Sequence, residues 1–324
     1  MDTLYIIMKY LVYECGLPGT LSGGWGDRLV GITSALSICK ATDSFFLIKW
    51  HDSNISDFFD YEKYDFFKQN IDGTTLSYVN HNSEELYEIF STKNIDEFFD
   101  SDIVLFNTNQ NVTEALCNNI LYKDKMENYE KCIKTIYESI FVEYLKPKQN
   151  VIEPVDQVFA IHEKIVGIQL RFGDYFMDNE KIQIDTSIHN TSLGKNIHYI
   201  IPFIDEIINR YNGHKIFITS DIDIKPMLNQ LTYADNIIYY DMIPTHIERS
   251  VDKTGIIKSF VDFIMLSKCH VLFLSFESNF GRCAGLINRS DDIYCIFNYD
   301  SKFFVETPTI TALSSKTYTH FLNN

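Results

Sequence analysis

Short apolar runs alternate with longer amphipathic segments through the second half of the chain. The apolar runs predict buried strands, and the longer segments predict helices because their apolar residues recur at helical spacing. The predicted strands are 165–170, 215–219, 236–240, 271–275 and 293–297, and the predicted helices are 201–210, 224–231, 255–268 and 281–288. This alternation favours a parallel sheet covered on both faces, whose ligands bind at the carboxyl ends of the strands.

The first half follows the same plan less regularly. It has predicted strands at 10–14, 45–50 and 103–106 and predicted helices at 27–40, 83–90 and 123–144. We therefore expect an α/β chain with two Rossmann-like domains facing across a cleft. The polar segment 146–154 contains two prolines, which disfavour continuous regular structure, and it divides the chain into domains 1–150 and 151–324. The last residues, from about Ser301, are expected to pack back on the first domain.

Composition narrows the possible partners. The 324 residues carry a net charge of −16, which argues against nucleic acid or an anionic membrane surface as the main partner. No apolar run is long enough for a transmembrane helix, and the N-terminus lacks a basic leader. The seven cysteines are odd in number and lack metal-type spacing, so we expect them to be reduced and buried, in a cytoplasmic protein without a metal site. The oligomeric state is not predicted.

The loop Gly23-Gly-Trp-Gly-Asp-Arg28 joins a predicted strand to a predicted helix. Glycines allow the backbone to approach a phosphate or a sugar closely. The loop is not a dinucleotide fingerprint, because Leu29 stands where the third glycine would be, and it is not a P-loop, because no GK[ST] follows. A tight turn with a helix cap is the alternative reading.

The segment Gln169-Leu-Arg-Phe-Gly-Asp174 ends a strand that should be buried. Arg171 therefore points out at the carboxyl edge of the sheet or is buried with a partner, because an unpaired buried guanidinium is costly. A bound anion would satisfy it in a bidentate way. A salt bridge to Asp174 or Asp221 is the alternative.

The segment 271–286 reads as a buried strand, a polar turn and a helix. Ser278 and Asn279 lie at the expected helix cap, and Arg282 lies in the first part of the helix. A helix N-terminus at the edge of a sheet offers N–H groups and a partial positive charge to a phosphate. Together with the two arginine-containing loops, this segment suggests a site for a nucleoside diphosphate.

Two further aspartates are candidate residues of this nucleotide site. Asp221 ends the strand Ile218-Thr-Ser-Asp221, where a helix cap is the alternative role. Asp262 lies among apolar residues of a predicted helix and therefore needs a partner. A guanine ring, which offers N–H donors, is one possible partner, and exposure on a solvated helix face is the competing reading.

Taken together, these segments resemble the inverting fucosyltransferases of the GT-B fold, the group of α1,6-fucosyltransferases, nodulation fucosyltransferases and protein O-fucosyltransferases. The loop 23–28 looks like their N-terminal glycine-rich loop, and 167–174 looks like their His-x-Arg-(Arg)-x-Asp motif. The stretches 262–269 and 275–282 look like their final donor-binding motif, and 218–221 matches the strand end between them. The matches fall in order, whereas residues 51–150 show no match to the motifs of this family.

The resemblance implies that the chain is a glycosyltransferase that moves fucose from GDP-fucose to a glycan acceptor without a metal. It implies that Arg171 holds the β-phosphate, that Asp262 and Gln169 face guanine, and that Ser278 and Asn279 cap the pyrophosphate. The other residues that it assigns to the donor site are Gly24, Gly26, Arg28, Asp221, Phe280 and Arg282.

The chain departs from the family pattern at two positions: Gln169 replaces the family's histidine, and Phe172 stands where many members have a second arginine. The group has no universal base, and the candidates here are Asp27, Asp174 and Glu180, in that order. Asp174 could instead orient Arg171. A GT-B transferase that uses another nucleotide sugar, and a non-catalytic nucleotide- or glycan-binding protein of the same fold, are the alternatives.

Overall fold

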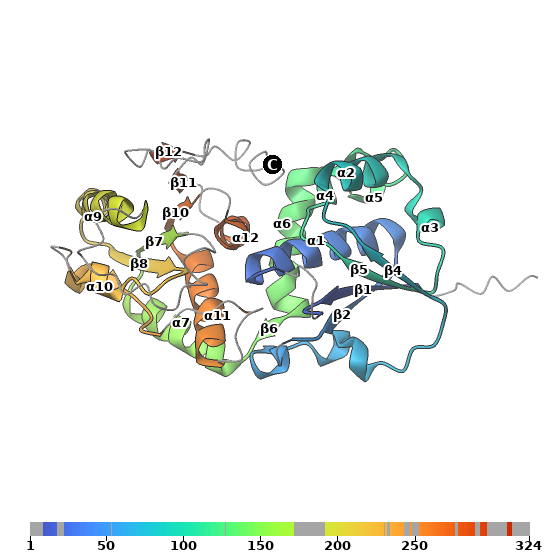
Figure 1. Ribbon diagram of the computed structural model, residues 1–324, viewed down its shortest axis with the longest axis horizontal. Coiled ribbons are helices and arrows are strands. Elements are labelled where there is room, and N and C mark those ends of the chain that lie inside the picture. The colour runs from blue at the N-terminus through green and yellow to red at the C-terminus, as the bar shows by residue number, and fades with distance from the viewer. Residues whose placement is uncertain are drawn as a thin grey trace, which may run out of the picture. The chain divides into compact units, whose positions relative to one another are not determined.

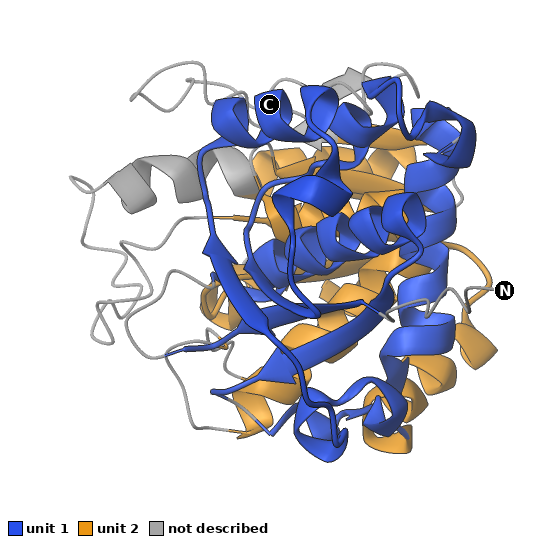
Figure 2. Cartoon of the chain, turned by 90° about the vertical axis from the view of Figure 1, so that its right-hand side faces the viewer, with its two compact units in different colours: residues 1–148, 322–324 blue, residues 149–321 orange. Residues whose placement is uncertain are grey.

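The computed structural model places the chain in two compact units, one ending at Lys148 and the other beginning at Gln149 (Figure 2). It describes residues 9–17, 23–52, 54–126, 128–171, 192–229, 231, 234–242, 247, 253–275, 278–288, 292–296 and 310–312. For 192–200, 295–296 and 310–312 only the backbone is described. Each unit is built around its own parallel sheet, and the two are described separately.

The sheet of the first unit has four parallel strands, shown in Figure 1, in the order β2 (Phe45–Trp50), β1 (Tyr10–Cys15), β5 (Ile103–Asn107) and β4 (Thr75–Val79). The expected strands β1, β2 and β5 are confirmed. The strand β4 was not predicted, because its polar and apolar residues alternate over only five positions and lie exposed or half-buried at the edge of the sheet.

The long helix α1 (Trp25–Thr42) packs against β1 in the first unit. Almost all of its side chains are buried, because the sheet lies on one side and the helices α4 and α6 lie on others. Gly31 permits this close approach, since an added Cβ there would collide with the Tyr13 ring and the Thr108 carbonyl. The helices around it are α2 (Ser83–Thr92), α3 (Ile95–Phe98), α4 (Thr113–Asn118), α5 (Lys123–Met126) and α6 (Tyr129–Ser139).

The sheet of the second unit has the strand order β12-β11-β10-β7-β8-β9. Its strands are β7 (Ile165–Leu170), β8 (Lys215–Ser220), β9 (Ile237–Ile238), β10 (Val271–Ser275), β11 (Ile293–Ile296) and β12 (Ile310–Ala312). All neighbours are parallel except β11 and β12. From β7 the chain moves outward to β8 and β9 and then returns to add β10 on the other side of β7. The pair β7–β10 is therefore the topological switch point, where open α/β sheets bind their ligands.

Helices pack on the sheet of the second unit, as the apolar strands predicted. They are α7 (Gln149–Ile161), α9 (Ser192–Arg210), α10 (Lys225–Leu228), α11 (Lys253–Lys268) and α12 (Asn279–Ile287). The helix α11 contacts β7, β8 and α12, and α12 contacts β10 (Figure 1). The core between the sheet and the helices is mostly aliphatic, with Ile168, Ile204 and Ile216 fully buried, and it includes the aromatic Phe273.

The expectation that the two prolines interrupt regular structure at 146–154 was wrong for Pro154, although β6 and α7 are separated at Lys148. Lys146–Pro147 form the short strand β6, which pairs with β3 (Phe59–Asp60), and α7 runs through Pro154. A proline inside a helix removes one hydrogen bond, but Val151 and Val155 of the same helix are completely buried and offset that loss.

The predicted helix 123–144 was also wrong as a single element. The structure has α5, then α6 from Tyr129, and then a π-helical turn η4 (Ile140–Tyr144). Asn128 caps α6 by accepting a hydrogen bond from the Lys131 backbone N–H, so the polar cap starts a new helix where periodicity alone indicated continuation. In the second unit, β9 and α10 are shorter than predicted, and β12, which pairs with β11, was not predicted.

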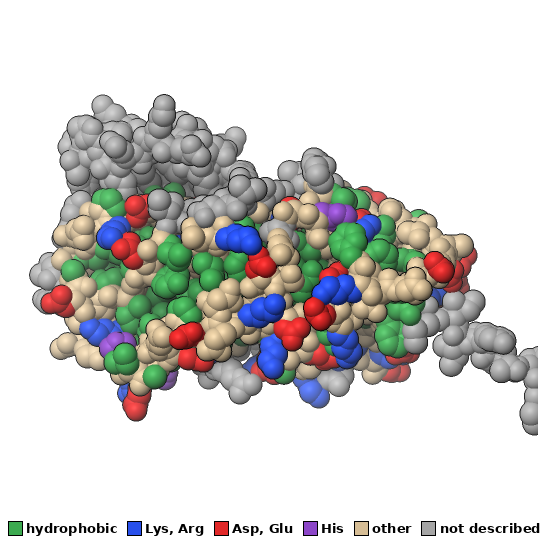
Figure 3. All heavy atoms as spheres, turned by 90° about the horizontal axis from the view of Figure 1, so that it is seen from below, with side chains coloured by type: hydrophobic (Ala, Val, Ile, Leu, Met, Phe, Trp, Pro, Cys, Tyr) green, Lys and Arg blue, Asp and Glu red, His purple; other side chains and the backbone are tan. Residues whose placement is uncertain are grey.

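None of the described helices is long and apolar enough to span a lipid bilayer. The face of the molecule in Figure 3 shows acidic and basic side chains next to one another over its described part, without a continuous basic stripe.

Candidate functional site

Three polar residues form a hydrogen-bonded cluster where β7 and β10 end. Gln169 pairs in register with Leu274, so its side chain reaches the turn after β10. The Gln169 Nε2 donates to Ser278 Oγ at 3.1 Å, and its Oε1 accepts from the Ser275 backbone N–H at 3.1 Å. Ser275 Oγ donates to the Gln169 carbonyl and accepts from the Arg171 backbone N–H, at 2.8 and 2.9 Å. The cluster fixes the backbone at the switch point.

The helix α12 begins at this cluster. Ser278 is its N-cap, and the Ser278 Oγ accepts a hydrogen bond from the Gly281 backbone N–H. The first-turn residues Asn279, Phe280 and Arg282 are partly exposed, and Phe280 packs edge-on against Phe263 of α11, with ring centroids 5.3 Å apart. A helix N-terminus at the end of a switch-point strand is suited to bind a phosphate.

Gly281 allows α12 to approach Gln169. A Cβ added at Gly281 would lie 2.8 Å from Gln169 Oε1, which is closer than real Cβ contacts come. We expect Gly281→Ala to displace the Gln169 side chain, to lower the free energy of unfolding by about 1–3 kcal/mol and to weaken nucleotide binding. Urea unfolding and nucleotide titration of the variant measure the two effects. Unchanged stability and binding would show that the Gln169 contacts do not position α12.

Arg171 follows β7 directly and is partly exposed. Its Nη1 donates to Asp221 Oδ2 at 2.9 Å, with 29% of the Arg171 side chain and 7% of the Asp221 side chain exposed. Of the two salt bridges weighed from the sequence, the one to Asp221 is present. Because Arg171 keeps exposed surface at the carboxyl edge of the sheet, it can contact an anion while Asp221 holds it in place.

Asp262 on α11 lies in a buried polar cluster beside the end of β8. Its Oδ2 accepts from Lys258 Nζ and from Thr219 Oγ1, both at 2.7 Å. Its Oδ1 is buried and has no hydrogen-bond partner among the described residues. Burial raises the pKa of the Asp262 carboxyl, and Lys258 and Thr219 oppose that rise. Thr219 is the register partner of Gln169, so this cluster and the switch-point cluster lie on neighbouring strands.

The glycine-rich loop lies in the first unit, after β1. Gly24 is the N-cap of α1, and its backbone N–H donates to Asp27 Oδ2 at 3.0 Å. Gly23 has φ +65°, a conformation that favours glycine, and an added Cβ there would meet the Asp27 side chain. The Asp27 carboxylate therefore closes the first turn of α1, and the loop has the helix-capping structure that was its alternative reading.

Arg28 is completely buried in the same loop. Its guanidinium binds both carboxylate oxygens of Asp52, donates to the Gly23 carbonyl at 3.2 Å and lies 4.6 Å from the centre of the Trp50 ring. Burial by itself would lower the pKa of Arg28, but the hydrogen bonds to Asp52 raise it above its ordinary value. Arg28 thus holds the loop to the end of β2, and Gly24 and Gly26 lie beside it.

Several residues of this arrangement were not predicted. Ser275 and Thr219 were inside quoted motifs without a role, and Lys258 and Asp52 were not considered. The spacing of Lys258 and Asp262, four residues apart on one helix, was a readable signal for their ion pair. No sequence signal pointed to Asp52, because its contact with Arg28 depends on the pairing of β1 with β2. The candidate bases Asp174 and Glu180 lie outside the described residues.

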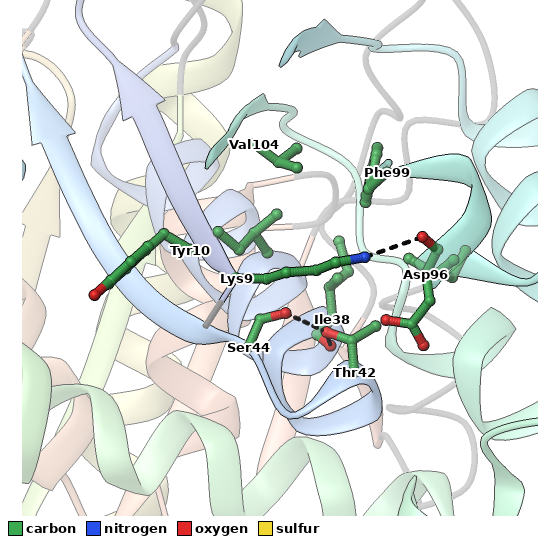
Figure 4. A pocket seen from close by; sticks show the side chains of 10 residues that line it. Lys9, Tyr10, Ile38, Thr42, Ser44, Asp96, Phe99 and Val104 are labelled. Carbon is green, nitrogen blue, oxygen red and sulfur yellow. Dashed lines mark hydrogen bonds between the residues drawn. The ribbon is translucent and has the colours of Figure 1, made fainter. Parts of the chain in front are cut away.

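Two further observations concern a small pocket and possible metal ligands. A small pocket in the first unit, at the amino ends of β1 and β5, is lined by Lys9, Thr42, Ser44 and Asp96 (Figure 4). Lys9 donates there to the Asp96 carbonyl, and Thr42 and Ser44 bond to each other. It lies at the opposite edge from the ligand-binding ends of the strands. Within the described part of the chain, no three His, Cys, Asp or Glu side chains are grouped to hold a metal.

Comparisons with known proteins identify the fold. No family model matches the sequence, and no curated protein matches it. The structure superposes on a mutant of Arabidopsis thaliana FUT1 in complex with GDP, with a TM-score of 0.62 and 13% identity over 94% of this chain and 73% of FUT1.

It also superposes on NodZ α1,6-fucosyltransferase soaked with GDP-fucose, with a TM-score of 0.57 and 15% identity over 94% of this chain and 99% of NodZ. A second structure of the fucosyltransferase NodZ, from Bradyrhizobium, gives a TM-score of 0.55 and 16% identity over 94% and 99% of the two chains. The chain therefore has the fold of the GT-B fucosyltransferases, as its motifs predicted.

Proposed function

We propose that the chain is a fucosyltransferase-like glycosyltransferase that transfers fucose from GDP-fucose to a hydroxyl group of a glycan, with inversion and without a metal. The observation that carries the proposal is the arrangement at the switch point of the second sheet. Arg171 and the N-terminus of α12 lie there together, fixed by Gln169, Ser275 and Ser278, in a fold shared with proteins solved with GDP or GDP-fucose.

The chemistry needs stabilisation of a leaving nucleoside diphosphate. Negative charge develops on its β-phosphate as the bond to the sugar breaks, and an arginine with helix-end N–H groups can stabilise that charge. Arg171 and the first turn of α12, from Ser278, supply these groups. An acceptor hydroxyl that attacks the opposite face of the sugar gives inversion.

The base that activates the acceptor is a separate part of the proposal. The Asp27 carboxylate accepts a hydrogen bond from the Gly24 N–H, so it would have to act with its remaining lone pairs. Asp174 and Glu180 remain candidates on the grounds of sequence. In the same proposal Gly24, Gly26 and Arg28 border the donor, with Arg28 acting through the loop that it holds.

The guanine end of the donor is assigned to Asp262. Guanine offers ring and amino N–H donors, and Asp262 Oδ1 is a buried acceptor without a partner among the described residues. Both polar ends of Gln169 are bonded to Ser275 and Ser278, so we propose that it contacts the base through its remaining lone pair and N–H.

A non-catalytic nucleotide-sugar-binding protein is the second candidate. The observation that favours it is the role of Gln169, which holds together the backbone of the site where the family pattern has a histidine. The buried Cys15, Cys39 and Cys269 support a cytoplasmic location for either candidate.

The test is turnover. The protein is incubated with GDP-fucose and a panel of glycan acceptors in the presence of EDTA, and the products are examined by mass spectrometry and by NMR of the anomeric proton. We expect a fucosylated glycan with inverted configuration. Binding of GDP-fucose without any product over the panel would favour the non-catalytic candidate, and a strict need for added metal would contradict the metal-free mechanism.

A further inference from the structure

A lysine is completely buried in the second unit beside the proposed guanine site. Lys258 of α11 has no exposed surface, and its ammonium donates to Asp262 Oδ2 at 2.7 Å. It also lies 4.5 Å from the centre of the Tyr239 ring. A buried ammonium is tolerated only with a partner of opposite charge, so Lys258 and Asp262 depend on each other.

The two oxygens of Asp262 are used unequally. Oδ2 accepts from Lys258 and Thr219, whereas Oδ1 is buried and accepts from no described residue. A buried carboxylate oxygen without a donor is costly, and at a ligand-binding sheet edge it is suited to a donor brought by a ligand. Guanine presents a ring N–H and an amino group on one edge, but adenine presents a ring-nitrogen acceptor there.

We propose that Lys258 is a positioning residue that keeps Asp262 ionised and occupies its Oδ2, so that Oδ1 faces the ligand as an acceptor and selects a base with N–H donors. The inference rests on the proposed function and adds the residue that makes the donor site select guanine. It predicts that the charge of Lys258, and not only its volume, determines the preference for guanine over adenine.

The charged and titratable groups around Asp262 determine how GDP affinity is expected to depend on pH. Lys258 faces it from α11, and Tyr239, after β9, faces both of them. Tyr240 lies farther from Lys258, at 6.0 Å, and Asp223 and Asp241 act on Tyr239. Burial raises the pKa of Asp262 and Lys258 opposes the rise, so loss of the lysine charge raises the pKa further. In a variant without the lysine charge, Asp262 is therefore protonated at lower pH and binds GDP weakly. As pH rises, Asp262 ionises and GDP affinity recovers.

The experiment titrates GDP and ADP into wild type, Lys258→Gln and Lys258→Met by calorimetry, between about pH 6 and pH 9. Glutamine keeps a hydrogen-bond donor without the charge, and methionine removes both. The matched control is Lys268→Met on the same helix, because Lys268 pairs with Asp156 at the exposed surface. Near neutral pH we expect both Lys258 variants to bind GDP about 10- to 100-fold more weakly, with affinity rising toward high pH, and the control to match wild type.

Equal loss of GDP and ADP affinity, without pH dependence, would overturn the inference and leave Lys258 a structural role. If neither single variant folds, Lys258→Met is combined with Asp262→Asn, which leaves no buried charge. The double variant must then lose its preference for GDP over ADP, and full retention of that preference overturns the inference. Wild type that binds no guanine nucleotide would instead overturn the proposed function, so the two failures are distinguishable.

Discussion

Replacement of Arg171 by alanine is expected to lower the rate of transfer by about 10²–10³ while leaving the fold intact. The side chain is the partly exposed cation at the end of β7, held by Asp221 beside the N-terminus of α12. Loss of one group that stabilises developing charge typically lowers the rate by about 10²–10³. Because Asp221 is only 7% exposed and loses a charged partner, we expect the free energy of unfolding to fall by about 1–3 kcal/mol. Single-turnover transfer and urea unfolding measure the two effects.

Two variants serve as controls for Arg171→Ala. Lys225→Ala removes an exposed lysine, paired with Asp241 near the same sheet edge, and should leave both transfer and stability unchanged. Arg171→Lys keeps the charge but loses the bidentate geometry, so its rate should fall between alanine and wild type. Full transfer activity in Arg171→Ala would show that the diphosphate is held elsewhere.

Arg28→Met is expected to have the largest effect on stability. Arg28 has no exposed surface, and its removal leaves the partly buried Asp52 without its partner at the end of β2. Breaking a buried pair from one side typically costs about 3–5 kcal/mol. Denaturant unfolding of the first unit, followed by the fluorescence of the nearby Trp25 and Trp50, would measure the loss.

A double variant that also removes Asp52 shows how much of the lost stability is due to the unpaired carboxylate. Arg28→Met combined with Asp52→Leu removes both charges and should recover part of the lost stability. The surface pair Lys125–Asp43 is the control, and Lys125→Met should cost less than about 1 kcal/mol. If Arg28→Met unfolds like wild type but loses GDP affinity, Arg28 contacts the donor directly and does not act by holding the loop.

Most strands of the parallel sheets were predictable because they are largely apolar. Phe45–Trp50, Ile165–Leu170 and Val271–Ser275 occur as the sequence indicated, since a strand buried on both faces leaves a continuous apolar run. Elements stabilised by neighbours were not predictable in this way. The helix α7 passes through Pro154 because its buried valines compensate, and β4 lies exposed or half-buried at the edge of its sheet.

The residues of the candidate site were predictable where the signal is local in the sequence. The cap Ser278 and the strand-end Arg171 follow from local sequence, because capping and strand ends are read within a few residues. The hydrogen bonds of Ser275 to Gln169 and to the Arg171 backbone N–H, in contrast, depend on which strands become neighbours. The return of the chain from β9 to β10 beside β7, which creates the switch point, involves strands about a hundred residues apart in sequence.

The most direct test of the account is a thermal-unfolding titration of wild type with GDP, UDP and ADP in the presence of EDTA. A ligand that binds only the native state stabilises it by about 2.7 kcal/mol at a hundredfold excess over its dissociation constant. The site at the ends of β7 and β10 predicts saturable stabilisation by GDP, weaker or absent effects of UDP and ADP, and loss of the GDP effect in Arg171→Ala. No stabilisation by any of the three nucleotides would contradict the assignment of this site.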